Sequence, residues 1–293
     1  MSTILETRGL THVYGAGTPF ERVALDHVDI QINKGEILGV IGHTGSGKST
    51  LIQHLNGLLQ PSEGEVLLDG KSIWDAKGKC ARETRFRVGL VFQYPEYQLF
   101  EIDVLTDVAF GPKNLGLSQE ESRKRAIDAL QLVGIKEEQY TLSPFELSGG
   151  QKRRVAIAGV MAMRPEVLIL DEPTAGLDPR GREEILQEIQ AYRNQTGATI
   201  LLVSHSMEDV ARHAKKILVM NAGKVFCYDT VANVFRRSQE LQAIGLAVPQ
   251  ITRVCDALRA RGVPLTDDIF TVEQAKQQLL EWYHRTRGGQ GTC

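Results

Sequence analysis

The clearest chemical feature of the sequence is a glycine-rich loop that ends in a lysine and a hydroxyl residue. It lies between an apolar run at 37–41 and an apolar helical pattern at 51–55, and it comprises Gly42, His43, Thr44, Gly45, Ser46, Gly47, Lys48 and Ser49, with Thr50 after it. Glycines at this spacing let successive backbone N–H groups surround an anion at a helix N-terminus. The lysine can reach the β- and γ-phosphates, and the serine hydroxyl can bind Mg²⁺. The loop predicts a nucleoside triphosphate site, and the alternative is a tight strand-to-helix turn with a solvated lysine.

Two carboxylates, Asp171 and Glu172, directly follow the apolar run 167–170. The carboxyl edge of a parallel sheet faces the ligand crevice, so a strand here would aim both carboxylates at a bound phosphate. We expect Asp171 to hold Mg²⁺, directly or through water. We expect Glu172 to orient and polarise the water that attacks the γ-phosphoryl group. The alternative is an acidic helix N-terminus stabilised by the helix dipole.

A second helix start also has the composition of an anion site. Its residues are Ser148, Gly149, Gly150 and Gln151, directly after Leu147. The serine is a natural N-cap and the two glycines expose backbone N–H groups. Two phosphate-binding helix ends in one chain indicate that one of them serves a partner's nucleotide. The alternative is an ordinary capped turn.

Together these motifs resemble those of the ATP-binding cassette ATPases over about residues 4–229, with 147–151 as the family signature. The resemblance implies that ATP and Mg²⁺ are the cofactors. DNA-repair and chromosome-structure members carry long coiled coils between their halves, and no heptad run occurs here. Translation factors of the family carry two cassettes on one chain, whereas this chain has one.

The same resemblance implies roles for four further residues. Tyr14 would stack on adenine, and Gln93 would contact Mg²⁺ and the attacking water. His205 would lie at the γ-phosphate, and Asp178, in the loop 175–178, would lie at a subunit interface. From the residues alone, Tyr14 could equally be a half-buried turn tyrosine and His205 a structural histidine. Asp178 could be a helix N-terminal carboxylate ahead of a proline, and both of its roles can hold.

Three segments, at 92–100, 108–112 and 144–146, narrow the resemblance to the ATPases of energy-coupling factor importers for vitamins and metal ions. That resemblance implies a second ATPase subunit, a transmembrane coupling subunit and a separate membrane protein that binds the substrate. Residues 173–178, together with Glu172, resemble one member of a paralogous pair and favour a heterodimer. The alternatives are another ABC importer, a dedicated cobalt or nickel system, and a freestanding regulatory ATPase.

The segment 94–101 also carries a physical signal for a partner. Aromatic and apolar side chains alternate there with carboxylates, namely Tyr94, Tyr97, Leu99 and Phe100 with Glu96 and Glu101. An exposed aromatic cluster rimmed by carboxylates can accept a helix that carries an arginine. The alternative is an internal contact between the core and a helical insertion.

Apolar patterning predicts how these motifs are positioned. Strands are expected at 25–32, 37–41, 65–68, 88–92, 167–170, 199–203 and 217–220. Helical patterns alternate with the later strands, which indicates an α/β class with a mostly parallel core. By resemblance, the fold is a P-loop NTPase of ABC type with an antiparallel β subdomain. We expect an ATPase domain at 1–235 with a helical subdomain at about 94–165. A helical dimerisation domain at 236–293 follows, and its tail, Arg287–Cys293, is expected to be disordered.

Composition argues against a nucleic-acid-binding, membrane-spanning or secreted protein. Thirty-four Lys and Arg against thirty-six Asp and Glu give a formal net charge of −2, so no cationic field favours nucleic acid as a partner. Apolar runs fall short of the roughly 18 to 20 residues that cross a bilayer, and the first ten residues lack a secretory pattern. The four cysteines are scattered without a C-x-x-C pair. We expect a peripheral protein on the cytoplasmic face of a membrane.

Overall fold

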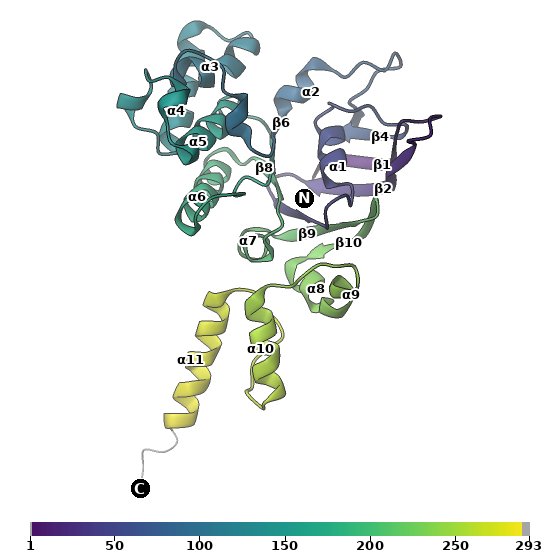
Figure 1. Cartoon of the computed structure of the whole chain (residues 1–293), viewed down its shortest axis with the longest axis vertical. Coiled ribbons are helices and arrows are strands. Elements are labelled where there is room, and N and C mark those ends of the chain that lie inside the picture. Colours follow the sequence, from purple (N-terminus) through teal and green to yellow (C-terminus); the bar gives the residue numbers. More distant parts are fainter. Residues whose placement is uncertain (1, 289–293) are drawn as a thin grey trace.

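The computed structural model describes residues 2–288 and contains two β-sheets surrounded by helices. In Figure 1 a group of helices lies on one side of the larger sheet and the smaller sheet lies on the other, while the last two helices project away from both. The smaller sheet is antiparallel, and its strand order is β2 (Arg22–Asn33), β1 (Thr3–Tyr14), β4 (Glu63–Leu68) and β5 (Lys71–Ser72).

The larger sheet holds the strands that carry the predicted motifs. Its order is β10 (Lys224–Thr230), β9 (Lys216–Asn221), β3 (Ile37–Ile41), β8 (Thr199–Val203), β7 (Val167–Asp171) and β6 (Val88–Val91). All neighbours are parallel except β10 and β9. Every residue of β3 and of β8 is buried, as expected for strands covered on both faces. The predicted strands are confirmed; β1, β5 and β10 were not predicted.

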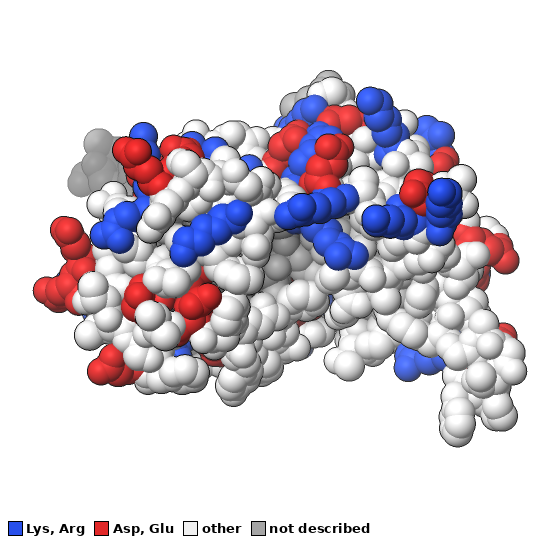
Figure 2. Space-filling model, turned by 90° about the horizontal axis from the view of Figure 1, so that it is seen from above, with Lys and Arg blue, Asp and Glu red and all other residues white. Residues whose placement is uncertain are grey.

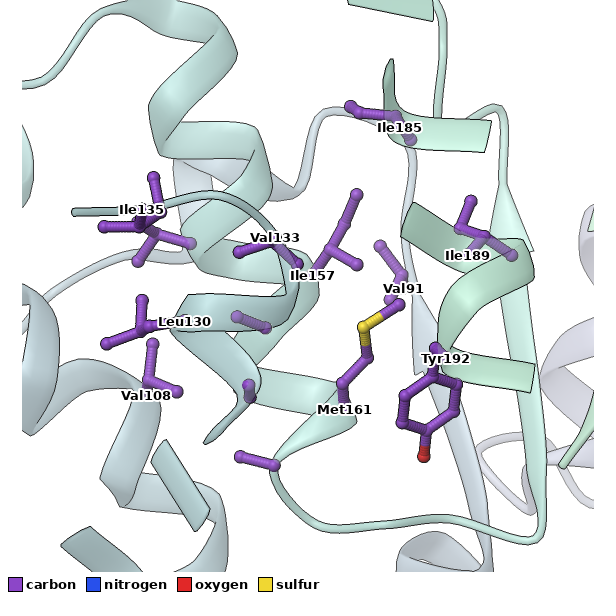
Figure 3. Close-up of a cluster of buried hydrophobic side chains, with 14 of the residues drawn as sticks. Val91, Val108, Leu130, Val133, Ile135, Ile157, Met161, Ile185, Ile189 and Tyr192 are labelled. Atoms are coloured by element: carbon purple, nitrogen blue, oxygen red, sulfur yellow. The ribbon is translucent and has the colours of Figure 1, made fainter. Parts of the chain in front are cut away.

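The helical group is joined to the larger sheet by a shared apolar core. Its helices are α3 (Val104–Asn114), α4 (Gln119–Leu132) and α5 (Gly149–Met161). The 3-10 turn η1 (Pro95–Gln98) precedes α3, and the turns η2 (Glu137–Gln139) and η3 (Pro144–Glu146) lie between α4 and α5. Figure 3 shows Val108 next to Leu130, and Met161 of α5 extending toward Val91 of β6 and Tyr192 of α6 (Pro179–Thr196). The predicted helical insertion is therefore packed against the sheet, and its position depends on α6.

Helices cover the rest of the sheets and form the C-terminal part. They are α1 (Lys48–Leu55), α2 (Arg82–Arg87), α7 (Met207–His213), α8 (Val231–Arg236), α9 (Ser238–Ala243), α10 (Gln250–Ala260) and α11 (Val272–Gly288). One buried cluster contains both Ile41 of β3 and Phe270. A second joins α10 and α11 through Cys255 and Ala275.

The predicted tail falls partly inside the last helix. Because α11 ends at Gly288, the helix includes the backbone of residues 287 and 288, the first two residues of the tail that we expect to be disordered. The rest of that tail, residues 289–293, lies outside the described residues.

The surface carries charges of both signs. On the face shown in Figure 2, lysine and arginine side chains are interspersed with aspartate and glutamate. Within residues 2–288, every helix is too short or too polar to cross a bilayer.

Candidate nucleotide-binding site

The glycine-rich loop connects β3 to α1, where the sequence predicted it. Gly45 and Gly47 adopt φ values of +79° and +103°, which L side chains rarely adopt. A Cβ on Gly47 would lie 2.7 Å from the carbonyl oxygen of Ala24, and one on Gly42 would collide with the Ser46 hydroxyl. The loop can therefore curve tightly over the start of α1 only with glycine at these positions.

Residues that the sequence analysis did not single out hold this loop in place. Asn221, at the end of β9, contacts His43 through its Oδ1, 3.0 Å from the histidine Nε2. The backbone N–H of Gly223 donates to the Ser46 carbonyl oxygen at 3.0 Å, and its own carbonyl accepts from the N–H of Asp26. The β9–β10 turn thus fixes the position of the phosphate loop through hydrogen bonds to His43 and Ser46. Its only sequence signal is the Asn-Ala-Gly turn composition.

Lys48 is the first residue of α1, and its side chain reaches back to the beginning of the loop. Its ammonium donates to the carbonyl oxygens of Gly42 at 2.7 Å and His43 at 3.1 Å. Burial lowers the pKa of Lys48, while the carboxylates of Glu172 and Asp171 oppose that shift. The Ser46 hydroxyl is fully buried and has no hydrogen-bond partner within residues 2–288. A positive charge held only by carbonyl oxygens next to an unpartnered donor fits a phosphate group.

The two predicted carboxylates lie next to this lysine at the carboxyl end of β7. Burial raises the pKa of Asp171, and Lys48 and the Ser49 hydroxyl act in the opposite direction. Glu172 has a φ of +50°, and its N–H donates to the Val203 carbonyl oxygen of β8 at 3.0 Å. Such a φ is rare outside glycine and is often found at functional sites. The neighbouring strand thus holds this backbone at the sheet edge.

Glu172 has the electrostatic properties of a proton acceptor. Burial raises its pKa to about 7, with the Asp171 carboxylate adding to the rise. His205 approaches it, with Nε2 3.4 Å from Glu172 Oε1, although this oxygen has no partner in hydrogen-bond geometry in the described part of the chain. Burial, followed by the charge of Lys48, lowers the pKa of His205, so the imidazole is neutral at pH 7. Both side chains line one hollow of about 370 Å³.

The donor set fits a magnesium ion that is shared with a nucleotide. Ser49 and Asp171 face each other at the phosphate loop. Gln93 is exposed just beyond the end of β6, and the strands β8 and β7 lie between β6 and β3. Within residues 2–288 no group of three His, Cys, Asp or Glu residues could hold a metal alone. Mg²⁺ prefers six oxygen ligands and often takes several from phosphates and water, so this sparse set suits it.

Tyr14 ends β1 close to the first turn of α1. Its hydroxyl lies 3.3 Å from Thr50 Oγ1, and its ring, which is 42% exposed, contacts His12 edge to face. Arg22 is its cross-strand partner on β2, and a guanidinium nitrogen of Arg22 would lie 3.2 Å from a Cβ at Gly45. The structure thus places an exposed aromatic ring beside the loop. The position of Arg22 depends on β-register, which the sequence analysis did not assign.

The signature helix start lines a different hollow. Ser148 caps α5, accepting from the Gln151 N–H at 3.4 Å, while the Gln151 side chain accepts from the Ser148 N–H at 2.9 Å. Ser148 shares a hollow of about 410 Å³ with Asp178. A Cβ on Gly149 or Gly150 would meet no atom within 4 Å, so this helix start is open.

Asp178 has the structural role that the residues alone predicted. Its side chain caps α6 by accepting from the Gly181 N–H at 2.9 Å. The hollow that it shares with Ser148 and the hollow of Glu172 have Gly176 and Leu177 in common. The loop 175–178 therefore separates the signature helix start from the carboxylate and histidine of the same chain.

One carboxylate of the aromatic segment is not available to a partner. Glu96 forms a bidentate ion pair with the buried Arg153 of α5, with distances of 3.0 Å and 2.6 Å. The expectation that Glu96 rims an exposed partner surface is therefore wrong, and the alternative of an internal contact applies to it. Leu99 is also buried, whereas Tyr97 and Phe100 are 85% and 59% exposed.

Comparison with known proteins agrees with this geometry. The family model described as "ABC transporter" matches residues 25–175, which include the phosphate loop, the signature and both carboxylates. Among solved structures, cbiO1 of Clostridium perfringens, described as part of the ABC transporter complex cbiONQ, has a TM-score of 0.73 and 39% identity. The similarity covers 87% of this chain and 100% of that one.

A dimeric ATP-binding cassette in a post-hydrolysis state with ADP and Pi has a TM-score of 0.68 and 30% identity. This similarity covers 78% of the present chain and 99% of the chain of the dimeric cassette.

Curated relatives narrow the class. Energy-coupling factor transporter ATP-binding protein EcfA2 of Caldanaerobacter subterraneus subsp. tengcongensis is 53% identical over 97% of this chain and 99% of its own length. The protein of the same name from Clostridium tetani is 54% identical over 96% of this chain and 97% of its own length. The chain therefore belongs to the ABC transporter family and, within it, to the energy-coupling factor transporter ATP-binding proteins.

Proposed function

We propose that this chain binds and hydrolyses ATP as one ATPase subunit of an energy-coupling factor importer for vitamins or other micronutrients. The observation that supports this most directly is the convergence at one sheet edge of Lys48, Asp171 and Glu172 with the phosphate loop. Full-length similarity to energy-coupling factor ATP-binding proteins supports the importer class.

The residues divide the chemistry between binding and proton acceptance. The backbone N–H groups of 42–50, with Lys48, would hold the β- and γ-phosphates. Ser49, Asp171 and Gln93 would hold Mg²⁺, which neutralises charge on the phosphates. Glu172, with its raised pKa, would accept a proton from water. Neutral His205 would donate a hydrogen bond toward the γ-phosphate, and Tyr14 would stack on adenine.

The second helix start supports a site that is shared between two ATPase subunits. Ser148, Gly149, Gly150 and Gln151 lie across the loop 175–178 from Glu172, so their open N–H groups do not face the hollow of their own carboxylate. We infer that they bind the γ-phosphate held by a second ABC ATPase subunit, a paralogue, with Asp178 at the interface. The chain's own phosphate loop would then receive the partner's signature.

A membrane location follows from the importer assignment and not from any segment of this chain. We infer a peripheral position at the cytoplasmic face of the membrane, on a transmembrane coupling subunit that also contacts a substrate-binding membrane subunit. Tyr97, Phe100 and Ile102 are exposed beside the Gln93 segment, which makes them the surface that a helix of the coupling subunit would contact.

The test compares Glu172→Gln with a matched carboxylate, Glu188→Gln, in the purified ATPase pair. Glu172→Gln keeps shape but removes the proton acceptor, so we expect turnover to fall by at least about 10²-fold while ATP binding survives. Glu188, which lies beside Arg154 and not at the phosphate loop, should tolerate the change. Hydrolysis by Glu172→Gln near the wild-type rate would refute the assignment. Copurification from gently solubilised membranes, with identification of the accompanying subunits, tests the importer class.

A further inference from the structure

Arg153 of α5 is buried, with a side chain only 3% exposed, and has three sets of partners. Nε and one terminal nitrogen donate to the two carboxylate oxygens of Glu96 at 3.0 Å and 2.6 Å. The other terminal nitrogen donates to the Ala175 carbonyl oxygen. The guanidinium carbon also lies 5.6 Å from the centre of the Tyr94 ring. One side chain therefore contacts two segments that are far apart in sequence.

Both contacted segments belong to the proposed catalytic region. Tyr94 directly follows Gln93 and has a φ of +56°, which fixes an unusual turn ahead of Glu96. Ala175 begins the loop 175–178, which carries Asp178. Gln93 follows the carboxyl end of β6, at the same sheet edge where Asp171 ends the parallel strand β7 and Glu172 follows it, whereas Asp178 shares a hollow with the signature helix start.

The chemistry of this contact requires an arginine. A guanidinium donates two parallel hydrogen bonds to a carboxylate and keeps further N–H groups in the same plane for a third acceptor. A lysine provides one point charge and cannot satisfy Glu96 on two atoms while also binding Ala175. Because the Arg153 side chain is only 3% exposed, its guanidinium depends on Glu96 and Ala175, and not on water, for its hydrogen bonds.

The neighbouring arginine makes a different connection. Arg154 pairs with Glu184 and lies 3.5 Å from Glu188, both on α6, so it ties the signature helix to α6. It has no contact with the Gln93 segment among its hydrogen bonds and ion pairs in the described chain. The bridge between the Gln93 segment and the loop 175–178 thus depends on Arg153.

We propose that Arg153 is a positioning residue that links the Gln93 segment to the loop 175–178, so that a shift at one nucleotide site is passed to the subunit interface. It contacts neither nucleotide nor metal and acts through Glu96 and Ala175. The inference rests on the proposed ATPase function and adds a route by which the two sites of a pair communicate.

The test uses Arg153→Lys, Glu96→Gln and the double variant in the ATPase pair. Coupling energies of this kind correspond to rate effects of about two- to thirtyfold, so we expect kcat to fall within that range while the Kd for ATP stays within twofold. Both changes break the same contact, so the double variant should lose no more kcat than the single variant with the larger loss. Arg164→Lys, in an exposed pair with Asp128, is the matched control and should keep full kcat.

The outcomes separate this inference from the proposed function. If folded Arg153→Lys keeps wild-type kcat, or if the two losses multiply in the double variant, the linking role is wrong while ATP hydrolysis stands. A merely structural role would lower the melting temperature and weaken ATP binding together with kcat. Should Arg153→Lys fail to fold, Glu96→Gln decides, because it keeps the arginine and its bond to Ala175: unchanged kcat overturns the proposal. Activity that is insensitive to Glu172→Gln would instead overturn the proposed function.

Discussion

Glu172 combines a buried carboxylate, a strained backbone and a position beside Lys48, and its pKa of about 7 makes its charge sensitive to physiological pH. Only the ionised form accepts a proton. As pH rises through 7 the ionised fraction increases, so kcat/KM for ATP hydrolysis should rise and level off above pH 8.

Initial rates of ATP hydrolysis measured between pH 5.5 and pH 8.5 test this rise in kcat/KM. Glu188 supplies the control, because burial also raises its pKa to about 7 but it lies beside Arg154 and not at the phosphate loop. Glu188→Gln should keep the rise in kcat/KM near pH 7. A flat wild-type profile across this range would contradict the role of Glu172 as the proton acceptor.

Lys48 is held by two carbonyl oxygens that a phosphate would replace as its partners. Lys48→Ala removes a charge-assisted contact, and we expect the Kd for ATP to rise about tenfold or more. Equilibrium titration with a fluorescent ATP analogue measures it. Lys34→Ala, which removes an ion pair with Asp69 elsewhere on the surface, should leave the Kd unchanged. Equal affinity in wild type and Lys48→Ala would exclude this lysine from the phosphate site.

At the scale of elements, the sequence predicts those strands whose burial follows from their own apolar residues. The runs at 37–41 and 199–203 are apolar without alternation and became fully buried parallel strands. By contrast, β1 was missed because its pairing with β2 shifts register at several points, which breaks the alternation expected of a regular strand. Bulges of this kind are set by tertiary pairing.

In the candidate site, too, the motifs could be predicted from the sequence but a contact set by tertiary packing could not. The phosphate loop, the signature and the carboxylates were identified from their order along the chain. The ion pair of Glu96 with Arg153 was not, because it joins residues 57 positions apart through the packing of α5 on η1. A carboxylate between aromatic residues has the same sequence pattern whether it faces a partner or an internal arginine. Only its burial distinguishes the two cases.

The signature helix start gives a prediction that belongs to α5 as an element. An arginine in place of Ser148 would fill the open hollow beside Asp178, so Ser148→Arg should leave ATP binding intact and block hydrolysis at the partner's site. Ser118→Arg is the matched control, since Ser118 caps α4 by the same contact, accepting from the Glu121 N–H at 3.2 Å. Losing that cap alone should not stop hydrolysis. Full-rate hydrolysis by an isolated monomer, independent of protein concentration, would refute the shared site.

At the scale of the whole molecule, the exposed apolar residues near the Gln93 segment predict assembly with the membrane subunit. Tyr97 and Ile102 are 85% and 81% exposed, so replacing both with serine should cost little folding stability. We expect Tyr97→Ser/Ile102→Ser to lose the coupling subunit during copurification while the detached ATPase pair keeps its rate. Retention of the complex and of transport would show that this surface does not bind the partner.

The C-terminal region packs partly into the ATPase core and partly carries exposed apolar side chains. Leu241, Leu246 and Phe270 are buried in the same cluster as Ile41 of β3, so removing the whole region from Ser238 onward would expose the core and confuse folding with assembly. A point change on the projecting helices avoids this problem. Val254 on α10 is 52% exposed and Leu280 on α11 is 46% exposed.

We propose that these two helices keep the ATPase subunits paired between turnovers, because exposed apolar side chains on projecting helices favour association. Val254→Asp/Leu280→Asp should therefore lower the dimer fraction without nucleotide, as measured by sedimentation, while the Kd for ATP stays unchanged. Arg253→Asp/Lys276→Asp, which alters charge on the same helices at exposed polar positions, is the control and should keep the dimer fraction of the wild type. Equal dimer fractions for the two double variants would show that pairing without nucleotide depends on other surfaces.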